Sequence, residues 1–258
     1  MTKRHRIQFP PDKEHQLSQA EAYFYIVEEG RLVKLRFHEY DKIFARPGLY
    51  EQLFYERLKC TSPQKVTELL QRSLASESAT FSELRVLDLG AGNGMMAERL
   101  RGIGVSRIVG VDIIPEAREA AFRDRPLAYD DYVVADCSDL STKQEQDLKD
   151  WSFDCLTSVA ALGFGDIPPV AFFRALQLVG PGGWVAFNIK ETFLESADDS
   201  GFSRFVRELI FSDFLEIHQL ERYTHRLSME GVRLKYYALI GRIMAPMPED
   251  FLGNLGVA

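Results

Sequence analysis

The stretch VLDLGAGNG, residues 86–94, decides how the rest of the chain is read. An apolar run with Asp88 inside it leads directly into glycines at the alternate positions 90, 92 and 94. Glycine adopts backbone conformations that other residues avoid, and it lets a ligand approach the main chain closely. The stretch is therefore typical of a strand that ends in a ligand-binding turn. The sequence around it must then indicate which ligand binds there.

From residue 84 onward, apolar runs alternate with helical patterns. Apolar strands without polar interruptions are expected when both faces of a parallel sheet are covered, and right-handed crossovers place the ligand crevice at the carboxyl ends of such strands. We predict an α/β fold with a seven-stranded, mostly parallel, doubly wound sheet and an antiparallel last strand. The predicted strands are 84–90, 107–113, 131–136, 153–160, 184–190, 214–225 and 234–244, and the predicted helices are 95–104, 115–122, 143–148, 170–179 and about 203–211.

The residues before this pattern form an accessory region. Aromatic and β-branched runs over 22–27 and 31–37 predict a β-hairpin. Ser62 has the features of a helix N-cap, with Pro63 at the first helical position. The polar stretch 75–80 is the expected boundary. We therefore divide the chain into an N-terminal hairpin and helical lid (1–80), a core (81–245) and a C-terminal tail (246–258).

Composition and charge narrow the range of functions. The formal charge is −7, and the sequence pI is about 5.4. Phosphate binding needs a basic face, so we expect no nucleic acid as the main partner. The first residues are basic but no apolar segment follows them, and no apolar run approaches the ~18 residues of a membrane span. We expect no secretory signal and no membrane partner, and the sequence leaves the oligomeric state open.

The three cysteines, Cys60, Cys137 and Cys155, are widely spaced and form no CxxC. This pattern predicts neither a disulfide framework nor a zinc site, and it favours a reduced, cytoplasmic compartment. The five histidines show no spacing that is typical of metal ligands, so we expect no metal. His38, His218 and His225 could serve as bases, but we interpret them as surface or strand residues.

Two phosphate-binding interpretations of the loop fail on its spacing. The dinucleotide fingerprint GxGxxG needs a glycine at position 95, where this chain has Met95. A carboxylate such as Asp88, aimed into the loop, would also repel a pyrophosphate. The phosphate-binding loop of nucleotide hydrolases needs Gly-Lys-Ser or Gly-Lys-Thr after the glycines, and neither follows here. The spacing favours a cofactor that carries a positive charge.

The motif resembles the first motif of class I S-adenosylmethionine-dependent methyltransferases, and the resemblance extends over residues 86–242. It implies that the acidic strand residue lies close to the charged amino group of the cofactor, often through water. It also implies that the glycine loop approaches the methionine portion. The residues that it places around this end of the cofactor are Asp88, Gly90, Ala91, Gly92, Asn93 and Gly94.

Further acids follow the next strands. Asp112 ends the second strand, where a carboxylate can accept hydrogen bonds from both ribose hydroxyls of an adenosine or of NAD. Ile113 is expected against the adenine face. The resemblance implies that Asp136, beside Cys137, faces the adenine amino group, and that the loop at Ser158 passes beneath the sulfonium. It also implies that Tyr40, in the lid, covers the cofactor.

Each acid also has a structural interpretation. Asp88 could cap a helix, Asp112 could be the N-cap before Pro115, and Asp136 could form a turn. Three acids at three successive strand ends favour cofactor binding. We predict an S-adenosylmethionine-dependent methyltransferase that acts on a small molecule at an O, N or C atom, with catalytic residues that the sequence does not identify. The alternatives are an NAD(P)-dependent oxidoreductase and a cofactor-binding pseudo-enzyme that acts as a partner subunit.

Three segments outside the core pattern are candidates for acceptor selection. The first is 38–41 together with Tyr50 and Tyr55, where the tyrosines could alternatively pack the lid on the core. The second is 162–166, and the third is 190–201.

Overall fold

The computed structural model describes residues 3–10, 21–162, 166–195 and 201–257. Its larger sheet has seven strands in the order β6-β5-β4-β7-β8-β10-β9. Neighbouring strands from β6 to β8 are parallel, and β10 runs antiparallel to both β8 and β9. The predicted fold class, including the antiparallel last strand, is confirmed. The strands are β4 (Arg85–Leu89), β5 (Arg107–Asp112), β6 (Asp131–Val134), β7 (Phe153–Ser158), β8 (Val179–Lys190), β9 (Leu215–Leu227) and β10 (Arg233–Ile243).

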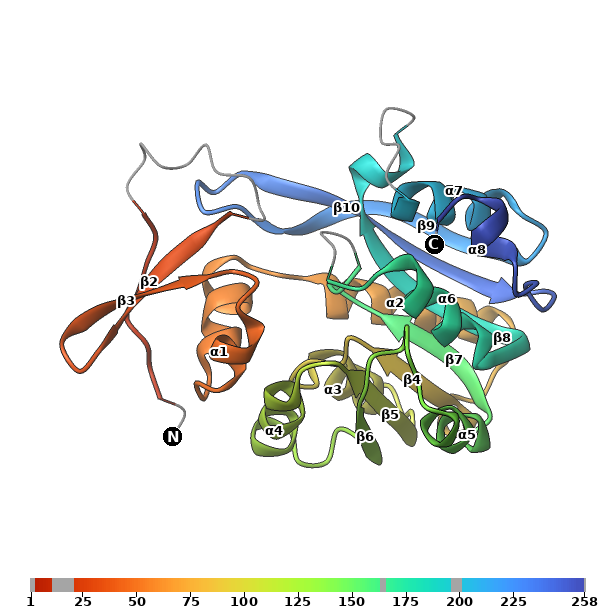
Figure 1. Ribbon diagram of the computed structural model, residues 1–258, viewed down its shortest axis with the longest axis horizontal. Coiled ribbons are helices and arrows are strands. Elements are labelled where there is room, and N and C mark those ends of the chain that lie inside the picture. The colour runs from red at the N-terminus through yellow and green to blue at the C-terminus, as the bar shows by residue number, and fades with distance from the viewer. Residues whose placement is uncertain (1–2, 11–20, 163–165, 196–200, 258) are drawn as a thin grey trace.

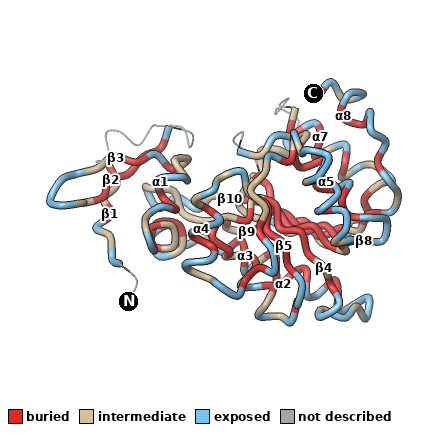
Figure 2. The backbone as a smooth tube through the Cα atoms, turned by 60° about the horizontal axis from the view of Figure 1, so that its bottom comes forward, coloured by how far each residue is buried: buried red, intermediate tan, exposed pale blue. Residues whose placement is uncertain are grey.

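Apolar clusters lie on both faces of this sheet, and its strands are buried within the core (Figure 2). Successive strand residues alternate between two apolar clusters: Val86 packs with the helices of one face, whereas Leu87 packs with those of the other. This period of two follows from the pleat of a strand. The helices are α2 (Ser62–Ser76), α3 (Met95–Gly102), α4 (Pro115–Asp124), α5 (Thr142–Asp150), α6 (Pro169–Gln177), α7 (Gly201–Phe211) and α8 (Phe251–Asn254), with 3-10 turns at Phe81–Glu83 and Glu191–Leu194.

The N-terminal residues form a separate three-stranded antiparallel sheet of β1 (Ile7–Gln8), β2 (Tyr23–Glu28) and β3 (Arg31–Arg36). The predicted hairpin is thereby confirmed. Its two-residue turn consists of Glu29 and Gly30, both at positive φ, as the right-handed twist of a hairpin requires. Helix α1 (Tyr40–Phe44) and a π-helical segment (Glu51–Arg57) follow and pack their apolar side chains on this small sheet. We call residues 3–10 and 21–60 the N-terminal module.

The N-terminal module contacts the core at several places, including His38 with Asp166 and Glu51 with Arg125. Phe44 packs against Ala117 and Ala120 of α4. The long β9–β10 hairpin extends beyond the large sheet and meets the module (Figure 1), where the Leu227 amide donates to the Leu58 carbonyl at 2.6 Å. Helix α2 packs with the core cluster that contains α3, although the predicted boundary assigns it to the lid. The division at residues 80 and 81 stays a prediction.

Two local predictions need correction. The N-cap of α2 is Thr61, and Ser62 is the first helical residue. The Ser62 hydroxyl instead lies 2.5 Å from Nδ1 of His225 and 2.6 Å from the Tyr223 hydroxyl, because α2 begins against β9. The helix predicted over 170–179 ends at Gln177, and β8 begins at Val179 rather than at the predicted residue 184, so that residues 180–183 belong to its irregular start. The register of β8 on β7 shifts there.

Candidate functional site

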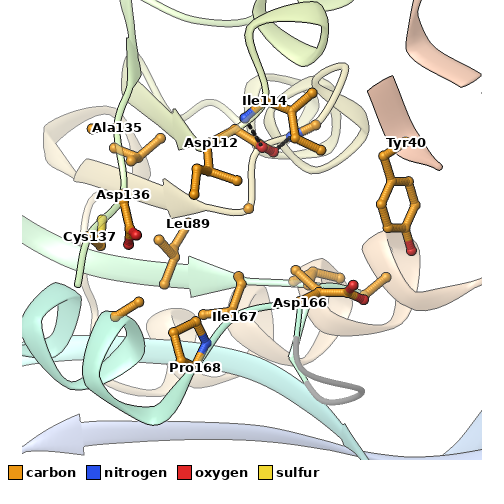
Figure 3. A pocket seen from close by; sticks show the side chains of 18 of the residues that line it. Tyr40, Leu89, Asp112, Ile114, Ala135, Asp136, Cys137, Asp166, Ile167 and Pro168 are labelled. Carbon is orange, nitrogen blue, oxygen red and sulfur yellow. Dashed lines mark hydrogen bonds between the residues drawn. The ribbon is translucent and has the colours of Figure 1, made fainter. Parts of the chain in front are cut away.

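A cavity of about 280 Å³ lies at the carboxyl ends of β4, β5, β6 and β7 (Figure 3). This is the edge where parallel α/β sheets bind their ligands. Its wall includes Gly90, Gly92, Asp112, Ile113, Asp136, Cys137 and Tyr40, all of which the sequence predicts to bind the cofactor.

The glycine loop is held by the neighbouring strand. The amides of Gly90 and Ala91 both donate to the Val111 carbonyl, at 2.9 and 3.1 Å. Gly90 has φ of +70°, and a Cβ there would stand 2.6 Å from the Cβ of Ala161. A Cβ on Gly92 would meet the Phe44 ring at 3.3 Å. The loop therefore tolerates only glycine at Gly90, and the cavity wall there is bare main chain.

Asp112 stands in the wall with both carboxylate oxygens facing backbone donors. Oδ2 accepts from the Gly92 amide at 2.9 Å and Oδ1 accepts from the Ile114 amide at 3.0 Å (Figure 3). Burial raises the pKa of Asp112, and these amides oppose that shift. The N-cap of α4 is Ile114, so Asp112 does not cap that helix. Each carboxylate oxygen has further lone pairs that can accept from a ligand hydroxyl.

Asp136 lies at the end of the cavity away from Tyr40 of the lid (Figure 3), and Ile113 also lines the cavity. Oδ1 of Asp136 accepts from the Ser138 amide at 2.8 Å and from the Ser138 hydroxyl, so the turn-forming interpretation describes part of its role. Ile113 lines the cavity and is 58% exposed, so its side chain is accessible to a ligand there. Burial is the main reason that the pKa of Cys137 is raised to about 12, so its thiol stays neutral.

Asp88 lies behind the loop rather than in the cavity wall. It is 1% exposed and accepts hydrogen bonds from the Tyr129 hydroxyl at 2.8 Å and the Thr157 hydroxyl at 2.7 Å. Burial raises its pKa to about 6, although both hydrogen bonds oppose the shift. Ala91, Asn93, Gly94 and Ser158 also lie outside the residues that line the cavity. A part for these five residues in cofactor binding stays a prediction.

The lid side of the cavity is aromatic. Tyr40 comes from α1 and stacks on Phe44, with ring centroids 6.0 Å apart. The ring centroids of Tyr50 and Phe44 lie 4.9 Å apart, and all three rings line the cavity. Burial raises the pKa of Tyr40 well above its usual value, so the phenol is neutral. The tyrosines therefore pack the lid and face the cavity at the same time, which combines the two interpretations of this segment.

A second chamber of about 50 Å³ adjoins the cavity. The two spaces share wall residues that include His38, Tyr40 and Asp166. In Figure 3, Tyr40 and Asp166 lie at one end of the cavity and Asp136 and Cys137 at the other. The remaining walls of the second chamber include Cys60, His225, Arg226 and Tyr236. No sequence pattern predicts this chamber, and two of the residues that line it, His38 and His225, are predicted as surface or strand residues.

The other candidate acceptor segments are only partly described. Residues 163–165 and 196–200 lie outside the described residues. Asp166 and Leu162 flank the first gap, and both line the second chamber.

The charge of the cavity distinguishes between cofactors. Asp112, Asp136 and Asp166 line it, and the described lining residues include no lysine or arginine. A site with this charge repels a pyrophosphate and attracts a cation. In the described ranges, no three His, Cys, Asp or Glu side chains gather as a metal site, and no helix has the length and hydropathy that a membrane crossing requires.

The residues present fit S-adenosylmethionine. The exposed main chain at the glycine loop gives room for the methionine portion, and Asp112 offers acceptors for ribose hydroxyls. Ile113 and the carboxylate of Asp136 offer an apolar face and an acceptor for adenine. The fold and this site define the class of protein: a class I S-adenosylmethionine-dependent methyltransferase.

Comparison with known proteins gives the family. The model of a methyltransferase domain family matches residues 56–234. The chain belongs to this family, which confirms the predicted resemblance and the predicted cofactor.

Among curated relatives, the chain is 30% identical over 110 residues to a ubiquinone biosynthesis O-methyltransferase from Thiobacillus denitrificans, covering 43% of this chain and 46% of that protein. It is 27% identical over 112 residues to the enzyme of the same name from Burkholderia vietnamiensis, covering 43% and 47%. The chain thus matches about half the length of these relatives.

Among solved structures, the fold is similar to that of an S-adenosylmethionine-dependent methyltransferase from Clostridium acetobutylicum. The TM-score is 0.51 at 14% identity, and the match covers 76% of this chain and 97% of that one. At this identity the likeness supports the fold.

Proposed function

We propose that the protein transfers the methyl group of S-adenosylmethionine to a hydroxyl oxygen of a small molecule. The observation that carries this proposal is the acidic cavity at the strand ends, lined by three carboxylates and, among its described residues, by no basic side chain except the imidazole of His38. The names of the two curated relatives support oxygen as the methylated atom.

The cofactor supplies a methyl group on a positively charged sulfur, which is already a strong electrophile. The protein has to align the acceptor with that methyl group and exclude water. In this proposal, Gly90 and Gly92 hold the amino-acid end, Asp112 accepts from the ribose, and Ile113 and Asp136 hold the adenine. Tyr40 closes the cavity from the lid side. Asp88 positions the loop through Tyr129 and Thr157.

Isothermal titration tests the cofactor. The protein should bind S-adenosylmethionine and S-adenosylhomocysteine, and NAD and NADP far more weakly. Asp112→Ala should weaken S-adenosylhomocysteine binding about 10- to 150-fold, the loss expected for a hydrogen bond to a charged group. Asp139→Ala is the matched control: this residue follows Asp136 in the same loop but lies outside the lining residues, and its affinity should equal that of the wild type.

The titration separates the first of two alternatives from the proposal, and a methyl-transfer assay separates the second. Tight NAD binding without S-adenosylmethionine binding would favour an oxidoreductase and reject the proposal. A pseudo-enzyme that serves as a partner subunit would bind the cofactor but transfer no methyl group to any acceptor, in the presence or absence of its partner.

The proposal also includes a cytoplasmic location, a small molecule as the main partner, and no dependence on nucleic acid. All three cysteines are free thiols, which supports a reducing compartment. Size-exclusion chromatography with light scattering, at concentrations from 1 to 100 times that of the assay, would determine the oligomeric state.

A further inference from the structure

The second chamber holds an arginine whose charge no carboxylate of the described residues balances. Arg226 lies on β9 and is half-buried. Its Nη1 donates to the Leu227 carbonyl at 2.9 Å, and its Cζ stands 5.8 Å from the centre of the Phe37 ring. By contrast, Arg222 on the same strand is exposed and pairs with Glu191 at 2.7 Å. Arginine in an enclosed site is suited to bind a carboxylate through two parallel hydrogen bonds.

Burial keeps the tyrosines, the cysteine and His225 of the chamber neutral. Burial raises the pKa of Cys60, and it raises the pKa of Tyr236 to about 12. Burial and the nearby charge of Arg226 lower the pKa of His225 to about 3. Tyr40 and Tyr50 also have raised pKa values because they are buried. Among the described residues that line this space, Arg226 is thus the one lysine or arginine.

His38 and Asp166 form a pair where the chamber meets the cofactor cavity. Nδ1 of His38 lies 3.1 Å from Oδ1 and 3.2 Å from Oδ2 of Asp166. A carboxylate at Nδ1 keeps the proton of the neutral ring on that nitrogen, which leaves the lone pair on Nε2. The two side chains are 26% and 30% exposed, so solvent can exchange protons with them. An imidazole oriented by a carboxylate is a typical general base.

We propose that the second chamber binds the acceptor and that the acceptor is a small carboxylic acid with a hydroxyl group. Arg226 binds the carboxylate, and His38, oriented by Asp166, takes the proton of the hydroxyl. This inference rests on the proposed function. In the step, the hydroxyl proton moves to Nε2 of His38 and from there to solvent. The oxygen–methyl bond forms as the sulfur–methyl bond breaks, and the bonding pair stays on sulfur, which loses its positive charge.

The chamber is small, which limits the acceptor to a compact molecule or to one whose acidic end alone enters. Its walls combine the apolar rings of Phe37 and Phe54 with Tyr236. We therefore choose 4-hydroxy-3-nitrobenzoate as the probe. It carries a carboxylate, a flat ring, and a hydroxyl whose loss of a proton produces a strong colour. Its methyl ester is the matched neutral probe.

The first experiment measures probe binding to the protein saturated with S-adenosylhomocysteine. The wild type should bind the acid more tightly than the ester. Arg226→Met should weaken binding of the acid about 10- to 150-fold and leave the ester unchanged, because one charged contact is lost. Arg226→Lys should bind the acid with an affinity between those of the wild type and Arg226→Met. Arg222→Met, on the same strand but already paired with Glu191, should behave as the wild type.

The second experiment records the colour of the bound probe at a pH below the pKa of its free hydroxyl. In the wild type the bound probe should show the phenolate band, because His38 has taken its proton. His38→Gln should bind the probe within a few-fold of the wild type but show no phenolate band. Asp166→Asn should weaken the band, since the ring loses its orientation. A residue with a merely structural role would not change this spectrum.

The outcomes separate the two proposals. Failure of the wild type to bind S-adenosylhomocysteine would reject the proposed function itself. Binding of S-adenosylhomocysteine by every variant, combined with equal affinity for acid and ester or with no binding of either probe, would overturn the acceptor site alone. A phenolate band that persists in His38→Gln would overturn the role of His38.

Discussion

The cofactor cavity and the second chamber share a wall but are built differently. The cavity is formed mainly by residues that follow four neighbouring strands of one sheet, so its chemistry comes from consecutive βα units. The second chamber is formed by residues from distant parts of the chain: His38 meets Asp166 across 128 positions, and Cys60 meets His225 across 165.

The cavity depends on features that all proteins of this topology share, whereas the second chamber depends on features of this chain. Strand ends of a doubly wound sheet come together in any protein with this topology, so the cofactor half depends on the fold. The second chamber requires the N-terminal module, α2 and the β9–β10 hairpin to pack against one another. We infer that acceptor specificity depends on that packing and can change while the cofactor half stays the same.

The largest expected effect concerns the pH dependence of the second chamber. The pKa of His225 is about 3 in the folded protein and about 6.5 in the unfolded chain. Between these values the unfolded chain binds a proton that the folded protein does not, so stability is present above pH 6.5 and lost as pH falls. The full loss in the free energy of unfolding is about 5 kcal/mol, of which about 2 kcal/mol is lost between pH 6.5 and 5.

Urea unfolding of His225→Gln and of the wild type at pH 7, 6 and 5 measures this contribution. The variant should be destabilised at pH 7, where it loses its hydrogen bond to Ser62, but should lose less stability on acidification. His225→Asn should show the same reduced pH slope. If both variants keep the wild-type slope, His225 is not the group responsible.

A second prediction tests the junction of the two halves. Phe44 is 4% exposed and packs against α4, Tyr40 and Tyr50. Phe44→Ala should lower the free energy of unfolding by about 3–5 kcal/mol, because it leaves a cavity in a packed cluster. Phe211→Ala is the control, since this ring is 83% exposed and its loss should cost less than about 0.5 kcal/mol. Similar values for the two variants would show that the module is loosely attached.

A third prediction concerns the cofactor half, where the pH dependence has the opposite sign. Burial raises the pKa of Asp88 from 3.8 to about 6, so the folded protein holds a proton that the unfolded chain releases. The stability from this group is fully present below pH 3.8 and is lost as pH rises through about 6, with a total of about 3 kcal/mol.

Asp88→Asn should remove this loss, so that the variant gains stability relative to the wild type as pH rises from 4 to 7. Thr157→Val should lose more stability than the wild type as pH rises, because the Thr157 hydroxyl donates to Asp88 and lowers its pKa. A parallel pH dependence of wild type and Asp88→Asn would contradict the assignment.

The smallest effect compares two glycines with positive φ. Gly90→Ala adds a Cβ 2.6 Å from that of Ala161, whereas at Gly231, with φ of +84°, no atom lies within 4 Å of the place that a Cβ would take. Both substitutions carry the backbone cost of about 1–2 kcal/mol, and overpacking adds about 1–3 kcal/mol at Gly90 alone. Chemical denaturation measures the difference, and equal destabilisation would mean that the loop yields easily.

The sequence predicts most of the cofactor half because its signals are local. The order of apolar runs, the three glycines and the acids at the strand ends each lie within a few residues of one another. Their topology follows from the handedness of βα units. The partners of Asp88 were not predictable in this way, since Tyr129 reaches it from outside any strand or helix, beyond the end of α4.

The second chamber could not be predicted because no local pattern marks it. Ser62 has the sequence features of an N-cap, yet its hydroxyl contacts His225 across the protein. His38 and Asp166 acquire a shared role only when the N-terminal module packs near β7. One sequence signal is a histidine, His38, between the aromatic residues Phe37 and Tyr40. Such a signal is weak without the tertiary structure.

The contact of β9 with the N-terminal module has a consequence for synthesis on the ribosome. The His225 carbonyl accepts from the Thr61 amide, and the Leu227 amide donates to the Leu58 carbonyl. Both strand residues leave the ribosome after β4, β5, β6 and β7, which frame the cofactor cavity. A growing chain can therefore assemble the glycine loop well before it can assemble the second chamber. The part of the protein in which we propose cofactor binding is thus synthesised before the hairpin that completes the second chamber.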